Sequence, residues 1–235
     1  VVAGGASAGG LEALEELLEH LPDDTGMAFL IVTHQHPGHT SLLPELLGKC
    51  TGMPVVQAQG GVRLEPDHIY VSPPGEQVAG MKAKIQLMGP PEHGSPPLLV
   101  DFCFRSLAED LGERAVCIVL SGTGSDGTVG LRAVKGAGGL VMVQEVESAR
   151  YGGMPSSAIA TKLADCVLPP AEMPDRLAAF ARSLARGEPT DDEVPRRLQQ
   201  PLQKIFMLLR SRTGHDFSAY KPRTMHRRVE RRMTV

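Results

Sequence analysis

Short apolar runs alternate with helical patterns along most of the chain. Leucines at positions 11, 14, 17, 18 and 21 lie on one helical face. The same patterns predict strands at 1–3, 28–32, 115–120, 140–143 and 166–168, and helices at 11–21, 41–47, 128–135, 155–162 and 174–184. Strands separated by helices are typical of a doubly wound sheet. We therefore predict an α/β fold of Rossmann-like type with a mainly parallel sheet.

Residues 52–90 interrupt this alternation. Three short strand patterns, at 55–56, 68–71 and 84–87, follow one another without a helix between them. Strands joined by short connections commonly pair in antiparallel hairpins. We expect these strands to form antiparallel additions at the edge of the main sheet.

The C-terminal part of the chain has a different composition. Residues 187–195 are rich in Glu, Asp and Pro, which is typical of a linker. Beyond them, apolar residues from position 202 to 209 form a helical face, and 221–233 is a strongly basic helical pattern. The predicted organisation is a first domain at 1–186, a linker at 187–200 and a small helical segment at 201–235.

The composition supports a first domain with a sizeable core. Of the 235 residues, 42% are hydrophobic, and only 4% are aromatic with no Trp, so an aliphatic core is expected. None of the four cysteines forms a CxxC pair, which argues against a zinc knuckle and favours reduced thiols. No apolar run approaches the roughly 18 residues of a membrane-spanning helix, and no signal peptide is visible. We expect a cytoplasmic protein without membrane insertion.

Charge is divided unevenly along the chain. Residues 196–235 carry a net charge of +9, whereas residues 1–195 carry −12. This asymmetry predicts two units with different partners. Nucleic acid is not the expected partner, because the positive charge is confined to one short tail without a nucleic-acid-binding fold.

The first candidate for chemistry is a turn of small residues around Ser7. The sequence from Gly5 to Gly9 fits the G-x-S-x-G pattern between a predicted strand and a predicted helix. Such a turn exposes the hydroxyl of a nucleophile, and the helix that follows offers N–H groups to a developing negative charge. A glycine-rich turn at this place can also bind phosphate, although the G-x-G-x-x-G spacing is absent. The turn alone therefore leaves both interpretations open.

Two further strand ends carry the other residues that a serine nucleophile needs. His34 directly follows the second buried strand, and Asp126 lies in a glycine-rich turn after the strand at 115–120. A histidine base oriented through Nδ1 by an aspartate would complete a catalytic triad. The alternatives are a polar loop of satisfied histidines, a metal site using His34 and His36, and, for Asp126, a cap for the helix near Thr128. The order Ser, His, Asp differs from the usual α/β-hydrolase order of Ser, Asp, His.

These motifs together resemble the catalytic domain of the CheB chemotaxis methylesterases, in the form found in CheB–CheR fusion proteins. The landmarks, in order, are GASAGGLEA at 5–13, the loop from His34 through Pro37 to Leu43, SGTGSDG at 121–127 and GMPSSAI at 153–159. The resemblance implies hydrolysis of glutamate methyl esters on the cytoplasmic helices of chemoreceptors, with deamidation of some glutamines as a second activity. It implies a Ser7–His34–Asp126 triad and no cofactor or metal.

The resemblance also assigns the residues around the triad. Ala8, Thr123, Gly124 and Met154 are expected at the oxyanion or substrate site, with the N–H of Thr123 helping to form the oxyanion hole. Ala8 stands where many family members have Thr, so a side-chain contribution there is lost. The family usually has Gln before its catalytic His, and here Gln35 precedes His36; the ungapped alignment of the loop nevertheless selects His34.

The basic tail resembles the start of the CheR methyltransferase N-terminal helical domain. The resemblance runs from Ile205 through Phe217 into the arginine-rich end of the chain. It implies contact with an acidic receptor through Arg223, Arg227, Arg228, Arg231 and Arg232. The alternative for the whole chain is a catalytically silent docking module that binds an acidic helical partner or a nucleotide.

Overall fold

The computed structural model describes residues 1–35, 41–89, 98–185, 196–213, 225 and 229. The contacts between residues divide the chain into two compact units, Val1–Ala178 and Ala179–Val235. The first unit contains every predicted catalytic residue.

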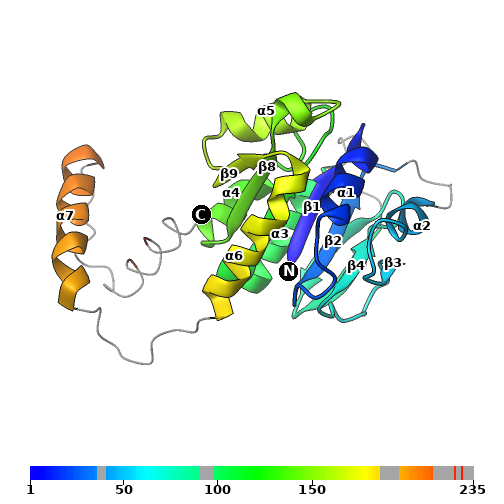
Figure 1. Cartoon of the computed structure of the whole chain (residues 1–235), viewed down its shortest axis with the longest axis horizontal. Helices are drawn as coiled ribbons and strands as arrows, with labels where there is room; N and C mark the ends of the chain where they lie inside the picture. Colours follow the sequence, from blue (N-terminus) through cyan, green and yellow to red (C-terminus); the bar gives the residue numbers. More distant parts are fainter. Residues whose placement is uncertain (36–40, 90–97, 186–195, 214–224, 226–228, 230–235) are drawn as a thin grey trace. The chain divides into compact units, whose positions relative to one another are not determined.

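Seven parallel strands form the main sheet of the first unit (Figure 1). Their order across the sheet is β3-β4-β2-β1-β7-β8-β9, and each neighbouring pair is parallel. The strands are β1 (Val2–Ala6), β2 (Ala28–Thr33), β3 (Val55–Gln57), β4 (His68–Val71), β7 (Val116–Val119), β8 (Leu140–Gln144) and β9 (Cys166–Leu168). The predicted doubly wound parallel sheet is confirmed.

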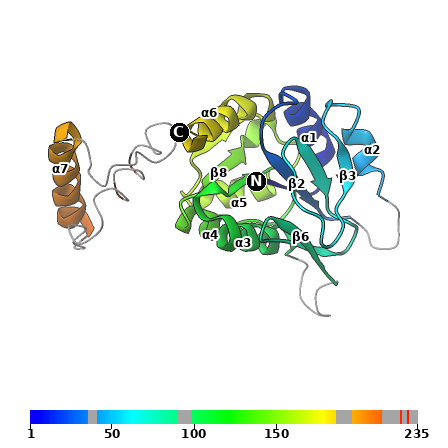
Figure 2. The same ribbon diagram turned by 90° about the horizontal axis from the view of Figure 1, so that it is seen from below.

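Helices cover both faces of this sheet. The helices are α1 (Gly10–Glu19), α2 (Leu43–Leu47), α3 (Leu99–Leu111), α4 (Gly130–Gly136), α5 (Gly153–Ala160) and α6 (Met173–Ala185), with short 3₁₀ turns at Gly112–Arg114, Val146–Ser148 and Pro170–Glu172. Figures 1 and 2 show α1 on one face and α3 and α4 on the other. Every residue of β1, β2, β7 and β8 is therefore buried, as expected for parallel strands packed on both sides.

Helix α3 has no counterpart among the predicted elements. Its buried positions Leu99, Val100, Cys103, Phe104 and Leu107 recur at helical spacing, so hydrophobic periodicity contains the signal for it. A Cβ added to Gly5 of β1 would lie 2.2 Å from a methyl carbon of Val100. Glycine in β1 thus lets the start of α3 approach the centre of the sheet closely.

The antiparallel interpretation of residues 52–90 is correct for one pair of strands only. Strands β5 (Gln77–Met81) and β6 (Lys84–Met88) form a separate two-stranded antiparallel sheet. Strands β3 and β4 instead extend the main sheet in parallel, which corrects the prediction. Their connection is an irregular crossover without a helix, held to β4 by the Tyr70 hydroxyl, which donates to the Arg63 carbonyl and accepts from the Glu65 N–H (both 3.1 Å).

The second unit contains helix α7 (Arg196–Thr213), which has Pro201 within it. This helix begins inside the predicted linker at 187–200. Of the predicted basic helix at 221–233, only Met225 and Val229 are described, and both are helical. The five arginines predicted to bind a partner lie outside the described residues. In the ranges given above, no helix is long and apolar enough to cross a lipid bilayer.

All four cysteines are free thiols, and two of them are fully buried. Burial raises the pKa of Cys103 to about 12 and the pKa of Cys117 further, so both stay protonated in the folded protein. Unfolded thiols ionise above a pH of about 8.5, and the fold should therefore lose stability as pH rises beyond that value.

We predict that a thiol reagent at pH 8 modifies Cys50 and Cys166 but reaches Cys103 and Cys117 only after denaturation. Mass spectrometry of the native and urea-treated protein measures this. The urea midpoint should also fall between pH 8 and pH 10. Equal labelling of Cys103 and Cys50 in the native protein would contradict the burial.

Candidate active site

Ser7 and His34 lie level with each other at the carboxyl edge of the sheet. The parallel register pairs Ala6 of β1 with Thr33 of β2, so each of the two candidate residues directly follows a paired residue. On the other side of β1, the Ser7 N–H donates to the carbonyl of Ser121, which follows β7 (2.9 Å). Ser7 is thus held between the ends of two neighbouring strands.

The turn after Ser7 leads directly into helix α1. The Gly10 N–H donates to the Ser7 carbonyl (2.9 Å), and Gly9 has a φ of +68°, which glycine adopts without strain. A Cβ on Gly9 would also lie 2.8 Å from the Cβ of Arg150 and from the Ser121 hydroxyl oxygen. Ser7 itself is not among the described residues with positive φ. The left-handed conformation of this turn thus falls on a glycine and not on Ser7.

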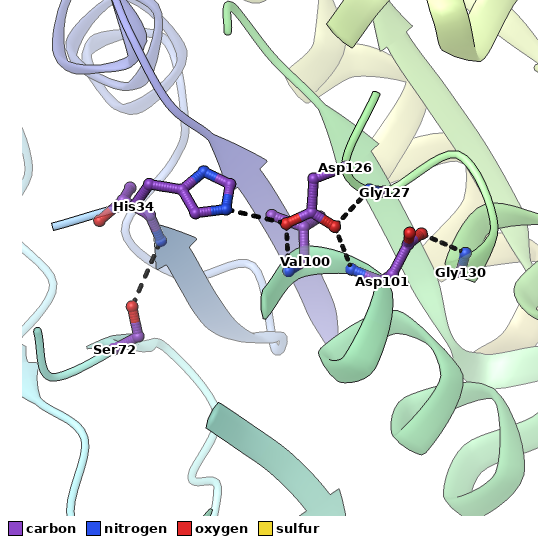
Figure 3. Close-up of polar contacts among 8 residues, drawn as sticks. His34, Ser72, Val100, Asp101, Asp126, Gly127 and Gly130 are labelled. Carbon is purple, nitrogen blue, oxygen red and sulfur yellow. Dashed lines mark hydrogen bonds and ion pairs between the residues drawn. The ribbon is translucent and has the colours of Figure 1, made fainter. Parts of the chain in front are cut away.

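His34 and Asp126 form a close pair across the end of β1 (Figure 3). The His34 Nε2 atom lies 3.0 Å from Asp126 Oδ2, and the two side chains are 27% and 5% exposed. The prediction that Asp126 binds Nδ1 is wrong. His34 follows β2 and Asp126 follows β7, and β1 lies between these two strands. The side chain of His34 must therefore reach across two strand spacings of about 4.8 Å each, so Nε2, the ring nitrogen farther from its own backbone, makes the contact. Nδ1, the ring nitrogen closer to the backbone of His34, is not the atom that contacts Asp126.

Asp126 also accepts three backbone N–H groups. Oδ2 accepts from Val100, and Oδ1 accepts from Asp101 and Gly127, at 2.8–2.9 Å (Figure 3). The first two donors belong to the opening turn of α3, so Asp126 caps that helix and not the helix near Thr128. Four donors in total saturate a carboxylate, which fixes the orientation of the group that holds His34.

The neighbouring carboxylate, Asp101, also caps a helix. Asp101 lies in the first turn of α3, and its Oδ1 accepts the N–H of Gly130 at the start of α4 (2.5 Å). Asp126 thus accepts N–H groups from the first turn of α3, which contains Asp101, and Asp101 accepts the first N–H of α4, which follows Asp126. Burial raises the pKa of Asp101, and the negative charge of Asp126 raises it further. Sequence reasoning missed Asp101 because α3 itself was not predicted.

Thr123 and Gly124 are exposed at the same edge of the sheet, as expected for groups that meet a substrate. The preceding residue, Gly122, packs against Ser7, since a Cβ there would lie 3.0 Å from the Cβ of Ser7. The Gly122 carbonyl accepts the N–H of Met154 (2.9 Å). In a trans peptide the C=O and N–H point in opposite directions, so the Thr123 N–H points away from α5.

Met154 was expected at the substrate site, and the structure corrects this for its side chain. That side chain is fully buried, and a Cβ on Gly122 would lie 2.2 Å from its sulfur. It cannot contact a substrate in this arrangement. Met154 instead packs beneath the loop at 121–124 and supports it through its backbone N–H.

Two alternatives from the sequence concern the histidine loop. His36 lies outside the described residues, so the preference for His34 over His36 rests on the observed His34–Asp126 contact and the ungapped alignment. Within the described ranges, no group of three or more His, Cys, Asp or Glu side chains is arranged to hold a metal ion.

Known proteins resemble both parts of the chain. A family model described as CheB methylesterase matches residues 2–177, and one described as CheR methyltransferase, all-alpha domain, matches residues 200–235. The catalytic domain of a CheB methylesterase from Thermotoga maritima has a similar fold, with a TM-score of 0.70 and 29% identity over 75% of this chain and 96% of that domain.

Curated relatives agree with this assignment. A protein-glutamate methylesterase/protein-glutamine glutaminase 1 from Myxococcus xanthus is 37% identical over 77% of this chain and 54% of its own length. One of the same name from Syntrophus aciditrophicus is 36% identical over 79% of this chain and 53% of its length. The chain thus spans about half the length of these relatives. Because the family model described as CheB methylesterase covers most of the chain, the chain belongs to the CheB methylesterase family.

Proposed function

We propose that this chain is a serine hydrolase that removes methyl esters from glutamate side chains of chemoreceptors. The observation that carries the proposal is the His34–Asp126 pair on the same strand edge as Ser7. Serine acyl transfer uses a serine at a strand-to-helix turn and an imidazole held by a buried carboxylate, and the ends of neighbouring strands bring these groups to the same edge of the sheet.

The proposed reaction passes through an acyl-enzyme. Ser7 Oγ attacks the ester carbonyl while His34 Nδ1 takes its proton, and Asp126 stabilises the imidazolium through Nε2. The tetrahedral intermediate collapses as the imidazolium returns the proton to the methoxide, which leaves as methanol. A water molecule, deprotonated by His34, then attacks the acyl-enzyme, and Ser7 leaves with the proton. The products are methanol and the glutamate side chain.

The negatively charged oxygen of the tetrahedral intermediate is stabilised by hydrogen-bond donors close to Ser7. The N–H of Ala8 follows the nucleophile, as in other strand-to-helix turns of this kind, and the N–H of Thr123 comes from the loop packed against Ser7. Gly124, with a φ of +81°, lets that loop turn sharply after Thr123. We assign Ala8 and Thr123 to the oxyanion hole and Gly124 to the shape of the loop.

Membership of the family supports a proposal for the substrate and the place of action. The relatives' names include protein-glutamine glutaminase, so we propose that this chain also deamidates receptor glutamines, releasing ammonia in place of methanol. We propose that the partner is the cytoplasmic helices of a methylated chemoreceptor and that the protein acts in the cytoplasm, without a cofactor.

The proposal is tested by measuring methanol release from a methylated receptor. Wild-type protein should release methanol, His34→Ala should lose about 10³-fold or more in kcat, and His36→Ala should stay within a fewfold. A reversed result for the two histidines would move the base to His36. No methanol release by the wild-type protein on methylated receptors would contradict the assignment.

The basic tail is proposed as a receptor-docking element. Residues 196–235 carry a net charge of +9, and several exposed ion pairs worth about 0.2–1 kcal/mol each would strengthen binding to an acidic partner. We predict that removal of 196–235 raises the Kd for receptor by roughly tenfold at low salt, with less effect at high salt. Fluorescence anisotropy with labelled receptor fragments measures this. Equal affinity with and without the tail would exclude the docking role.

A further inference from the structure

Ser121 lies at the centre of the hydrogen bonds around the nucleophile. It is fully buried just beyond the end of β7. Its N–H donates to the Gln144 side-chain oxygen (2.8 Å), and its carbonyl accepts the Ser7 N–H (2.9 Å). Both backbone groups of Ser121 are therefore occupied, and one of them already contacts the serine that we propose as nucleophile.

The hydroxyl of Ser121 joins two further segments. Its oxygen accepts the N–H of Tyr151 (3.0 Å), and it lies 2.9 Å from the carbonyl oxygen of Ala8 and 3.4 Å from that of Tyr151. A hydroxyl has a single hydrogen to donate, so the shorter contact with Ala8 is the donated bond. The side chain of Ser121 thus connects the turn after Ser7 to the loop that leads into α5.

The hydrogen bond from the Ser121 hydroxyl to the Ala8 carbonyl determines which way the peptide group between Ala8 and Gly9 faces. Because C=O and N–H point in opposite directions in a trans peptide, holding the Ala8 carbonyl at Ser121 directs the Gly9 N–H away from Ser121. The bond from Gly10 to the Ser7 carbonyl fixes the preceding peptide group in the same manner, which directs the Ala8 N–H. Within the described ranges, neither of these two N–H groups donates to another part of the protein.

We propose that Ser121 is a positioning residue for the methylesterase reaction, whose hydroxyl holds the turn after Ser7 so that the Ala8 N–H stays directed at the developing oxyanion. The proposal rests on the function assigned above. Ser121 touches no substrate; it acts through the Ala8 and Gly9 peptide groups. A buried donor network preorganises charge stabilisation in this way without reorganisation during the reaction. Loss of the hydroxyl would leave the Ala8 carbonyl and the Tyr151 N–H without their partner and release the turn.

The test compares Ser121→Ala with Ser106→Ala. Ser106 is a matched control, because its hydroxyl likewise donates to a carbonyl, that of Cys103, and accepts an N–H, that of Gly80, between α3 and β5. Active sites are first counted with a serine-directed phosphonate, and kcat and KM for methanol release are then expressed per labelled site. We expect Ser121→Ala to lose roughly 10- to 100-fold in kcat with KM within about twofold, as for a small misplacement of catalytic groups. Ser106→Ala should keep kcat and lose only thermal stability.

Conservative variants separate positioning from folding. Ser121→Thr keeps the hydroxyl and should recover most of kcat, whereas Ser121→Cys keeps the volume with a weak donor and should not. If Ser121→Ala is insoluble, the kcat values of Ser121→Thr and Ser121→Cys test the proposal instead. A Ser121→Ala or Ser121→Cys kcat within twofold of wild type overturns the proposal while leaving the methylesterase function intact. An inactive wild-type protein would instead overturn the function itself.

Discussion

Ser7→Ala is expected to lose about 10³-fold or more in kcat for methanol release, with little change in stability. The hydroxyl is the nucleophile in the proposed reaction, and without it no acyl-enzyme forms. The residual rate would come from the oxyanion donors and from binding alone. Ser7 is only partly buried, and its structural contacts are backbone bonds to Ser121 and Gly10 that alanine retains.

Two measurements accompany this variant. A serine-directed phosphonate should add one group to the wild-type protein at Ser7 and none to Ser7→Ala, as read by mass spectrometry of the intact protein. Ser183→Ala is the control, because its hydroxyl donates to the Phe180 carbonyl within α6, away from the candidate triad. Unchanged esterase activity in Ser7→Ala would remove Ser7 from the mechanism. Absence of labelling in wild type, together with receptor binding, would favour the silent docking module.

Asp126→Asn is expected to lose about 10³- to 10⁴-fold in kcat and also to lower the free energy of unfolding. Oδ2 of Asp126 accepts from both His34 and Val100, so an amide nitrogen in its place would face two donors. With the amide turned over, the nitrogen would face Asp101 and Gly127 instead. Either way two donors lose their acceptor, and each buried backbone N–H left unpaired costs about 1–3 kcal/mol.

Asp101→Asn is the matched control for this variant. Asp101 is also a buried aspartate that caps a helix, but its side chain bonds the N–H of Gly130 and not His34. An amide oxygen can still accept that bond, and the substitution removes a buried charge beside Asp126. Activity assays and urea unfolding of both variants measure the difference. Equal loss of kcat in the two would show that Asp126 serves only to hold α3 and α4 together.

Much of the fold was predictable because its signals are local. The aliphatic runs of β2, β7 and β8 and the leucine face of α1 recur at fixed spacings, and each predicted element there was found within a few residues. The turn at Ser7 was recognisable for the same reason, since small residues between a strand and a helix are adjacent in sequence. The crossover between β3 and β4 has no such signal, and these strands were wrongly predicted to pair in an antiparallel manner.

The sequence by itself placed Ser7, His34 and Asp126 at the ends of three strands, because strand ends are set by neighbouring residues. Only the tertiary structure decided how they meet. The strand order places β1 between the strands that precede His34 and Asp126, and this spacing selects Nε2. Helix α3 supplies two of the N–H groups that hold the carboxylate. Met154 likewise packs against the loop around Gly122, and Ser121 bonds Ala8 and Tyr151; the residues in each contact lie about 30 or more positions apart in the sequence. Such contacts depend on how the whole chain packs, and no spacing along the sequence encodes them.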